Sequence, residues 1–280
     1  MPLLETETER IWFDEAGDGG TPVLLVMGFG LTGNTWLPQI RGLKTYHRVA
    51  WYDHPGIGRS TLGRLKYDMT WLADQAIGIL DKLNWQSAHV VGVSMGGMIA
   101  QQMALKYGHR VRSLALMATT AGGLLGHLLI SRNVQKLVKC FLGSPRQRAQ
   151  AFIRLAFTPE FSVAKQPPWF RDIWTRDVAG DPSMRTLAAQ VNAIRRHNTG
   201  ANLHRLGGLP TSIFVPEQDS LIPPCEGYRL GKLIPGSKIV RFAGAGHGLN
   251  WQFSDQVNER LLAHFDGADE MMNKGDVAAS

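Results

Sequence analysis

Short β-rich runs alternate with longer helical patterns along most of this 280-residue chain, and this alternation constrains the fold more than any other feature. Such alternation is typical of a parallel sheet that is covered by helices on both faces. The predicted strands span residues 21–27, 48–52, 88–93, 113–117, 212–215 and 238–242. The sequence therefore predicts an α/β fold with a mostly parallel central sheet.

A helix is predicted between the second and third strands, because apolar residues recur there at helical spacing. These residues are Met69, Leu72, Ala76, Ile79, Leu80 and Leu83. Either Asp68 or Thr70 is expected to cap the first turn. We expect the apolar face of this helix to pack against the sheet.

The regular alternation stops after Met117 and resumes at Pro210, and the residues between are basic, aromatic and helical in pattern. An α/β chain of this length commonly closes around one large core. The sequence therefore predicts a single core made of residues 1–119 and 208–280, interrupted by an inserted helical cap at residues 120–207.

Further helices are predicted from capping residues and apolar stripes. In the predicted cap they span 131–142 and 145–157, with a third that begins at Asp181-Pro182. A terminal helix is expected at 255–265, and the polar tail at 267–280 is expected to be poorly ordered.

The net charge of +7 comes from one part of the chain. Residues 120–205 hold 13 Lys and Arg against 4 Asp and Glu, a net charge of +9. This excess suggests an anionic substrate or an acidic surface, although charge runs are more often solvated faces. No nucleic-acid partner is predicted, because no recognition helix or stacking platform accompanies the charge.

The remaining composition, with 44% hydrophobic and 19% charged residues, is ordinary for a soluble globular protein. No segment approaches the ~20 apolar residues of a membrane span, and the N-terminus resembles no secretory signal, so a cytoplasmic location is expected. Cys140 and Cys225 lack partners at metal-ligand spacing, and both are expected to be buried thiols. No cofactor or metal is predicted, and the sequence does not indicate an oligomeric state.

The strongest motif runs from His89 to Ala100, where a β-branched strand enters Gly-x-Ser-x-Gly and leaves into a helical pattern. A serine that protrudes from so tight a turn needs small residues two positions away on each side, which Gly92 and Gly96 provide. The run resembles the nucleophile elbow of the α/β-hydrolase superfamily, which implies that Ser94 is a nucleophile. Dehalogenases and epoxide hydrolases of this superfamily have aspartate there, so the serine argues against both.

The resemblance also implies an oxyanion hole made of two backbone N–H groups. The strand before Gly28 ends in a glycine-rich turn, and the donors would be Phe29 and Met95. Met27 stands where the superfamily usually has histidine. This departure removes a side chain that often braces the turn, but the donors themselves are backbone groups.

An acid and a base complete the expected triad in the chain order Ser, Asp, His. Asp219 lies in a loop that resembles the superfamily's acid loop, and Glu217 is the nearest alternative. His247 lies in a glycine-rich loop after the last strand, where it can reach back to the serine. His54, in a loop that follows the second strand, is the alternative histidine.

The resemblance implies a carboxylic ester or lactone hydrolase that works through an acyl-enzyme. A carbon–carbon bond hydrolase, a cofactor-free perhydrolase and a non-catalytic ligand receptor remain as alternatives on the same fold. Aromatic side chains of the predicted cap are expected to help line an apolar pocket. The predicted substrate contacts are Gly28, Trp36, Phe141, Trp169, Trp174 and Leu249.

Overall fold

An eight-stranded sheet forms the centre of the computed structural model, which describes residues 2–63, 67–123, 133, 136, 138–170, 172 and 182–279. The strands lie in the order β1-β2-β4-β3-β5-β6-β7-β8. Pairings from β4 across to β8 are parallel, and β1–β2 and β2–β4 are antiparallel. The strands are β1 (Leu3–Glu5), β2 (Arg10–Ala16), β3 (Pro22–Val26), β4 (Arg48–Tyr52), β5 (Ala88–Val93), β6 (Val111–Met117), β7 (Thr211–Pro216) and β8 (Lys238–Phe242). The predicted fold class is confirmed.

All six predicted strands are present, with ends that differ by two residues or fewer. The sequence did not predict β1 and β2. In β2 the consecutive residues Ile11, Trp12 and Phe13 are all buried, so the strand lacks the apolar–polar alternation that marks a half-exposed strand. Both strands also precede the regular alternation of strands and helices.

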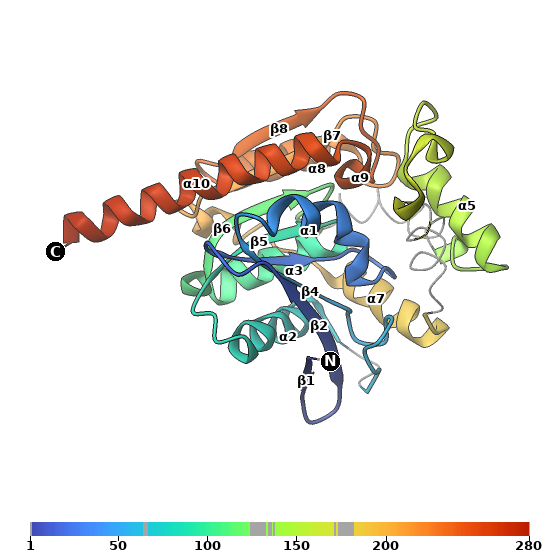
Figure 1. Cartoon of the computed structure of the whole chain (residues 1–280), viewed down its shortest axis with the longest axis horizontal. Helices are drawn as coiled ribbons and strands as arrows, with labels where there is room; N and C mark the ends of the chain where they lie inside the picture. The colour runs from blue at the N-terminus through green and yellow to red at the C-terminus, as the bar shows by residue number, and fades with distance from the viewer. Residues whose placement is uncertain are drawn as a thin grey trace.

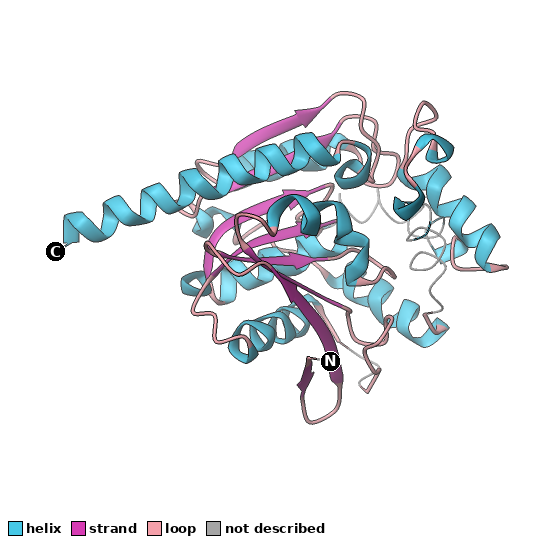
Figure 2. Cartoon of the chain, viewed as in Figure 1, coloured by secondary structure: helices cyan, strands magenta, loops and turns pink. Residues whose placement is uncertain are grey.

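Helices cover both faces of the sheet (Figure 2). The α-helices whose bounds lie within the described residues are α1 (Leu37–Leu43), α2 (Met69–Lys82), α3 (Met95–Lys106), α5 (Pro145–Ala156), α7 (Met184–Arg196), α8 (Pro224–Leu233), α9 (Leu249–Gln252) and α10 (Ser254–Ala279). In Figure 1, α2 and α3 lie on one side of the sheet and α1 and α10 on the other. Because side chains alternate along a strand, Leu24 and Val90 pack on the α2–α3 side, whereas Leu25 and Val91 pack on the α1–α10 side.

The start of α2 illustrates how a polar residue sets a helix boundary. The Asp68 carboxylate accepts a hydrogen bond from the Trp71 backbone N–H, so the helix begins at Met69 as predicted. The apolar stripe that includes Leu72 and Ile79 is buried toward the sheet. Of the two predicted caps, Asp68 is the one that the structure uses.

Within residues 120–207, Gly122 and Asn198 form an isolated antiparallel bridge, so two points of this segment that are far apart in sequence lie side by side. The described part of this segment includes α5 and α7, which lie on the side of the sheet toward which the parallel strands point (Figure 1). The division into core and cap remains a prediction. Of the helix predicted at 131–142, residues 133, 136, 138 and 139 are helical, and the remainder up to residue 137 lies outside the described residues.

The predicted start of α7 was wrong by two residues. The helix begins at Met184, and the Ser183 side chain caps it by accepting a hydrogen bond from the Thr186 N–H. A serine is as good an N-cap as an aspartate, and Ser183 lies directly before the helix. Asp181 itself lies outside the described residues.

The expectation of a poorly ordered tail was wrong for the first part of residues 267–280, which continues the terminal helix. The terminal helix α10 runs from Ser254 to Ala279, well beyond residue 265. Past Phe265, Ala268 is buried and the Asp269 carboxylate accepts hydrogen bonds from Thr21 and Arg112. These contacts hold the middle of α10 on the sheet, and Figure 1 shows its last turns extending past it.

The two cysteines differ in their surroundings. Cys140 is buried, and this burial raises the pKa of its thiol to about 11. Cys225 is exposed, because α8 buries Glu226, Gly227 and Leu230 on a different face. The prediction of a buried thiol was therefore wrong for Cys225.

Candidate active site

Ser94 occupies a strained turn between β5 and α3. Its backbone has φ 55° and ψ −121°, a conformation that costs a side-chain-bearing residue about 1–3 kcal/mol. A Cβ added to Gly92 would lie 2.4 Å from the Gly96 carbonyl oxygen, and one added to Gly96 would lie 2.0 Å from the Val26 carbonyl oxygen. The glycines are therefore required by backbone packing, as the spacing of the motif predicted.

His247 and Asp219 meet beside this turn, each from a loop that follows a parallel strand. The imidazole Nδ1 lies 2.7 Å from the Asp219 Oδ2, and the Asp219 side chain is fully buried. Its other oxygen, Oδ1, accepts hydrogen bonds from the Leu221 and Ile222 backbone N–H groups at 2.7 and 2.9 Å. Because a carboxylate only accepts, Nδ1 carries the proton and Nε2 is left with a free lone pair.

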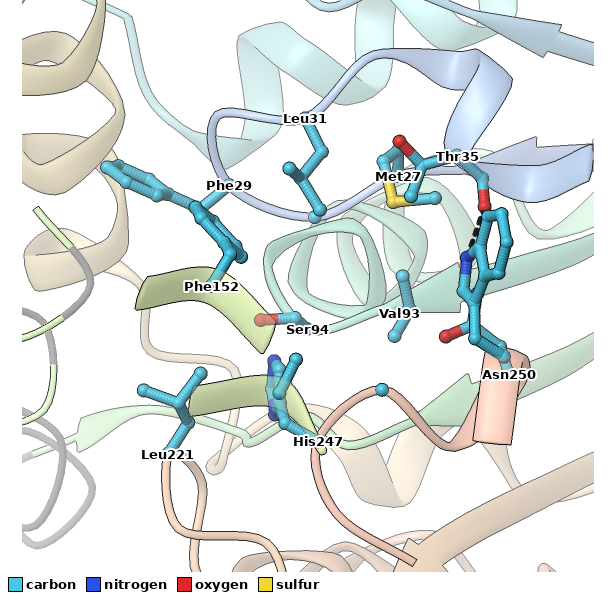
Figure 3. A pocket seen from close by; sticks show the side chains of 14 residues that line it. Met27, Phe29, Leu31, Thr35, Val93, Ser94, Phe152, Leu221, His247 and Asn250 are labelled. Carbon is cyan, nitrogen blue, oxygen red and sulfur yellow. Dashed lines mark hydrogen bonds between the residues drawn. The ribbon is translucent and has the colours of Figure 1, made fainter. Parts of the chain in front are cut away.

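Ser94 and His247 line one cavity of about 50 Å³, which has room for a few water molecules. Figure 3 shows the Ser94 hydroxyl and the His247 ring facing this space. Within the described chain no hydrogen bond joins the two side chains, a separation that catalytic pairs often show before substrate binds. The lining residues are Met27, Gly28, Phe29, Leu31, Thr35, Val93, Ser94, Phe152, Ala156, Leu221, His247, Gly248, Asn250 and Trp251.

The turn after β3 lies directly against the serine. A Cβ on Gly28 would stand 3.2 Å from the Ser94 Cβ, so the backbone of this turn approaches the nucleophile closely. The Phe29 and Met95 N–H groups have no hydrogen-bond acceptor within the part of the chain that the structure describes. Two backbone donors without an acceptor there thus lie near the Ser94 turn, one directly after Gly28 and one directly after Ser94.

The predicted substrate contacts fall into three groups. Gly28 lines the cavity, whereas Trp36 and Leu249 are fully buried in the core behind it. Phe141 and Trp169 do not line the cavity but pack against residues that do. The Phe141 ring lies edge-on to Phe29, with 5.6 Å between ring centroids, and the Trp169 ring packs on Trp251, with 6.0 Å between ring centroids. Trp174 lies outside the described residues.

Sequence reasoning missed several lining residues, and the polar or aromatic ones among them include Thr35, besides the group formed by Leu221, Asn250 and Trp251. The last three directly follow the predicted acid and base in the chain, and that proximity was the available signal. The Trp251 indole N–H donates to the Thr35 carbonyl at 2.7 Å, drawn as a dashed line in Figure 3. The Thr35 hydroxyl is buried without a partner in the described part of the chain.

The two alternative residues, His54 and Glu217, lie away from the cavity. His54 is fully buried, its Nε2 bonds to the Met27 carbonyl at 2.7 Å, and burial lowers its pKa. Glu217 accepts hydrogen bonds from Arg241 and Tyr228, which lower the pKa of its carboxyl group. Neither lines the space that Ser94 faces.

With the fold and this geometry established, comparison with known proteins identifies the family. A family model described as the alpha/beta hydrolase fold matches residues 21–254. The chain therefore belongs to the α/β-hydrolase fold family.

Curated relatives that match most of the chain include the following two. One is the dihydrolipoyllysine-residue acetyltransferase component of the acetoin cleaving system of Pseudomonas putida, 29% identical over 254 residues. The match covers 90% of this chain but 65% of that protein, slightly less than two thirds of its length. The other is the proposed carbamate hydrolase RutD of Azorhizobium caulinodans, 28% identical, with 94% of this chain and 97% of that protein covered.

Solved structures share the fold at lower identity. A thermophilic esterase from Thermogutta terrifontis superposes with a TM-score of 0.79 at 24% identity, covering 93% of this chain and 94% of its own. An enol-lactonase from Burkholderia xenovorans superposes with a TM-score of 0.79 at 21% identity, covering 95% of this chain and 100% of its own. Among the helices that the structure describes, none has the length and apolar character that crossing a bilayer demands.

Proposed function

We propose that this protein hydrolyses a carboxylic ester or lactone through a triad of Ser94, His247 and Asp219. The observation that carries the proposal is the serine at the strained turn facing the same cavity as His247, whose Nδ1 lies 2.7 Å from the buried Asp219. This arrangement leaves Nε2 free to accept the serine proton. The esterase and enol-lactonase among the structural neighbours support this choice of reaction.

The proposed reaction has two halves. His247 Nε2 takes the Ser94 hydroxyl proton as Oγ attacks the carbonyl carbon, and the carbonyl oxygen becomes an oxyanion. This intermediate collapses, the carbon–oxygen bond to the alcohol breaks, and the alcohol leaves with the proton from His247. Water then attacks the acyl group while His247 takes its proton, and the proton returns to Ser94 Oγ as the carboxylic acid departs.

The free N–H groups of Phe29 and Met95 are proposed to hold the oxyanion. Both flank the nucleophile and neither has another acceptor in the described structure. Donors that are already oriented toward the developing charge need no rearrangement during the reaction. Met95 also begins α3, so the positive end of that helix dipole faces the same point.

The size and lining of the cavity favour a substrate with a small, neutral acyl group. Ligand pockets usually measure ~300 Å³ or more, whereas this cavity holds about 50 Å³. Of the described lining residues only His247 has an ionisable side chain. Attraction of an anionic substrate by the net charge of +9 over residues 120–205 is therefore proposed for the approach to the cavity and not for the cavity itself.

Labelling with a fluorophosphonate probe tests the nucleophile directly. We expect the protein to be labelled and to hydrolyse p-nitrophenyl acetate, and we expect Ser94→Ala to abolish both. Neutral and carboxylate-bearing esters compared across salt concentrations would measure the charge effect. Labelling that persists in Ser94→Ala would refute the triad, and so would binding of esters without turnover. Preferential cleavage of a β-diketone, or oxidation that depends on peroxide, would redirect the assignment to the alternative chemistries.

A further inference from the structure

The backbone turn at Gly28, Phe29 and Gly30 receives no support from a polar side chain at position 27. Met27 is buried and apolar, so it offers no hydrogen bond to the turn. Gly30 has φ +70°, in the left-handed region, where a glycine has more backbone freedom than any other residue. The position of the Phe29 N–H therefore depends on contacts from elsewhere in the chain.

One such contact comes from α7. The Gln190 Oε1 accepts a hydrogen bond from the Gly30 N–H at 2.9 Å, across 160 positions of sequence. The Gln190 side chain is fully buried, so water cannot replace this bond. Because the partner is an N–H donor, only the carbonyl oxygen of the amide can face it. The bond fixes the peptide plane that directly follows Phe29, and so restrains the ψ angle of Phe29 and the φ angle of Gly30.

A second contact comes from Phe141. A Cβ on Gly30 would lie 2.1 Å from the tip of the Phe141 ring, so the ring lies directly on the turn. The same ring packs edge-on to Phe29 at 5.6 Å and to Phe152 at 5.1 Å between centroids. These two contacts come from residues 120–207, whereas the His54 bond to the Met27 carbonyl holds the peptide that precedes Gly28.

We propose that Gln190 is a positioning residue that holds the Phe29 N–H in place for the oxyanion. This inference rests on the proposed function and deepens it, because the segment that covers the cavity then also assembles part of the oxyanion hole. A displacement of α7 releases the Gly30 N–H, and the hole loses one oriented donor. The rate of turnover therefore depends on α7 remaining packed against the core.

Two substitutions at position 190 separate the hydrogen bond from the packing. Gln190→Met keeps the volume and removes the acceptor, whereas Gln190→Glu keeps an oxygen that accepts from Gly30. Loss of a whole oxyanion donor lowers kcat by about 10²–10³-fold. Loss of the hydrogen bond that only positions this donor is therefore expected to lower kcat by roughly tenfold. We expect Gln190→Met to lower kcat for p-nitrophenyl acetate by about tenfold with KM within about twofold, and Gln190→Glu to recover most of the loss.

The affinity of a boronic acid gives a readout that a merely structural change would not produce. Phenylboronic acid adds to the serine oxygen and places a boronate oxygen in the hole, so its Ki is expected to rise about tenfold in Gln190→Met. The matched control is Thr186→Val on the same helix, which removes the 3.3 Å hydrogen bond from the Thr186 hydroxyl to the Gly56 carbonyl. This variant is expected to keep the kcat and the boronate Ki of the unmodified protein.

The outcomes distinguish this inference from the proposed function. If Gln190→Met keeps the original kcat and boronate affinity, the positioning role is overturned while the triad stands. Equal losses in Gln190→Met and Thr186→Val would also overturn it, because they would indicate a general loosening of α7. If Gln190→Met does not fold, Phe141→Leu tests the same turn with the same two measurements. Failure of the triad itself would appear separately, as fluorophosphonate labelling that survives Ser94→Ala.

Discussion

At the residue scale, the most tightly determined side chain of the candidate site is Asp219. One oxygen faces His247 and the other accepts two backbone N–H groups, from Leu221 and Ile222. The carboxylate cannot rotate without losing hydrogen bonds that burial makes costly to leave unmade. Its orientation, and with it the ring orientation of His247, is therefore fixed before any substrate arrives.

Replacement of Asp219 by asparagine tests this orientation. In Asp219→Asn the amide oxygen is expected to stay with the Leu221 and Ile222 N–H groups, so the amide NH₂ faces Nδ1 and the imidazole loses the acceptor that keeps the proton there. In a serine protease the same change lowers kcat by about 10⁴, and we expect a fall of about 10³–10⁴ here with KM changed little. Steady-state hydrolysis of p-nitrophenyl acetate measures both constants.

Glu217→Gln is the matched control, because Glu217 pairs with Arg241 and Tyr228 away from the cavity. We expect this variant to retain kcat within about twofold. A comparable loss in both variants would contradict a specific role for Asp219.

Sequence reasoning predicted the site residues that carry local signals. Ser94, Asp219 and His247 each lie in a glycine-rich or turn-forming loop after a predicted strand, and the structure brings Asp219 and His247 into contact and places Ser94 on the same cavity. Gln190 carries no such signal. Its partner Gly30 lies 160 positions away, and a glutamine on a helix is ordinarily a solvent-facing residue.

At the scale of the element, the turn from β5 into α3 depends on close backbone contact. The Gly96 Cα approaches β3 so closely that a Cβ would stand 2.0 Å from the Val26 carbonyl and 2.6 Å from the Met27 carbonyl. Backbone atoms in the middle of a sheet cannot move aside as a flexible side chain can. The turn therefore tolerates glycine alone at this position.

We predict that Gly96→Ala destabilises the protein by about 3 kcal/mol or more, the upper range for an overpacked core. Urea unfolding followed by circular dichroism measures this free energy. Gly267→Ala is the matched control, because a Cβ at Gly267 in α10 meets nothing within 4 Å. The free energy of unfolding of Gly267→Ala should rise by about 0.5–1 kcal/mol, as expected for alanine in place of glycine in a helix. Equal stability in the two variants would be incompatible with the turn as described.

Strands with a recognisable pattern in their own sequence were predicted well, whereas a helix that depends on contacts with distant residues was not. The strands from β3 to β8 each show a compact apolar run between turn residues. The continuation of α10 past Phe265 depends on Asp269, whose partners Thr21 and Arg112 lie far away in the chain. The residues that neighbour position 269 in the sequence do not indicate those contacts.

At the scale of the whole molecule, two histidines lie in the packing between the sheet and α10. His89 stacks on Phe265 at 4.5 Å between ring centroids and lies near Asp269, and the His264 Nδ1 bonds to the Ser212 hydroxyl at 3.0 Å. Burial lowers the pKa of His264 to about 4, and burial also lowers the pKa of His89 despite the nearby Asp269 carboxylate. Both rings are therefore neutral in the folded protein at neutral pH.

These histidines predict a loss of stability in mild acid. Their ordinary pKa is 6.5, so below that pH the unfolded chain binds protons that the folded chain does not. The free energy of unfolding should fall as the pH decreases from about 6.5 toward 4, by on the order of 2–3 kcal/mol for His264 alone. Urea titrations at pH 7, 6, 5 and 4 would measure this dependence.

His264→Asn is the control for the pH series, because asparagine can still bond to Ser212 but does not titrate. Its free energy of unfolding should decline less steeply over the same interval. A slope identical to that of the unmodified protein would mean that His264 is not desolvated in the folded state.

The bridge between Gly122 and Asn198 has a consequence for evolution and for engineering. If residues 120–207 are an inserted cap as predicted, Gly122 and Asn198 already lie side by side near its two ends, and another insert with closely spaced ends can be grafted there at small entropic cost. If Gln190 acts as proposed, such a graft must supply its own acceptor to the Gly30 N–H. The activity of a chimera with a new substrate preference would then depend on this one acceptor oxygen, even where its new pocket fits the intended substrate.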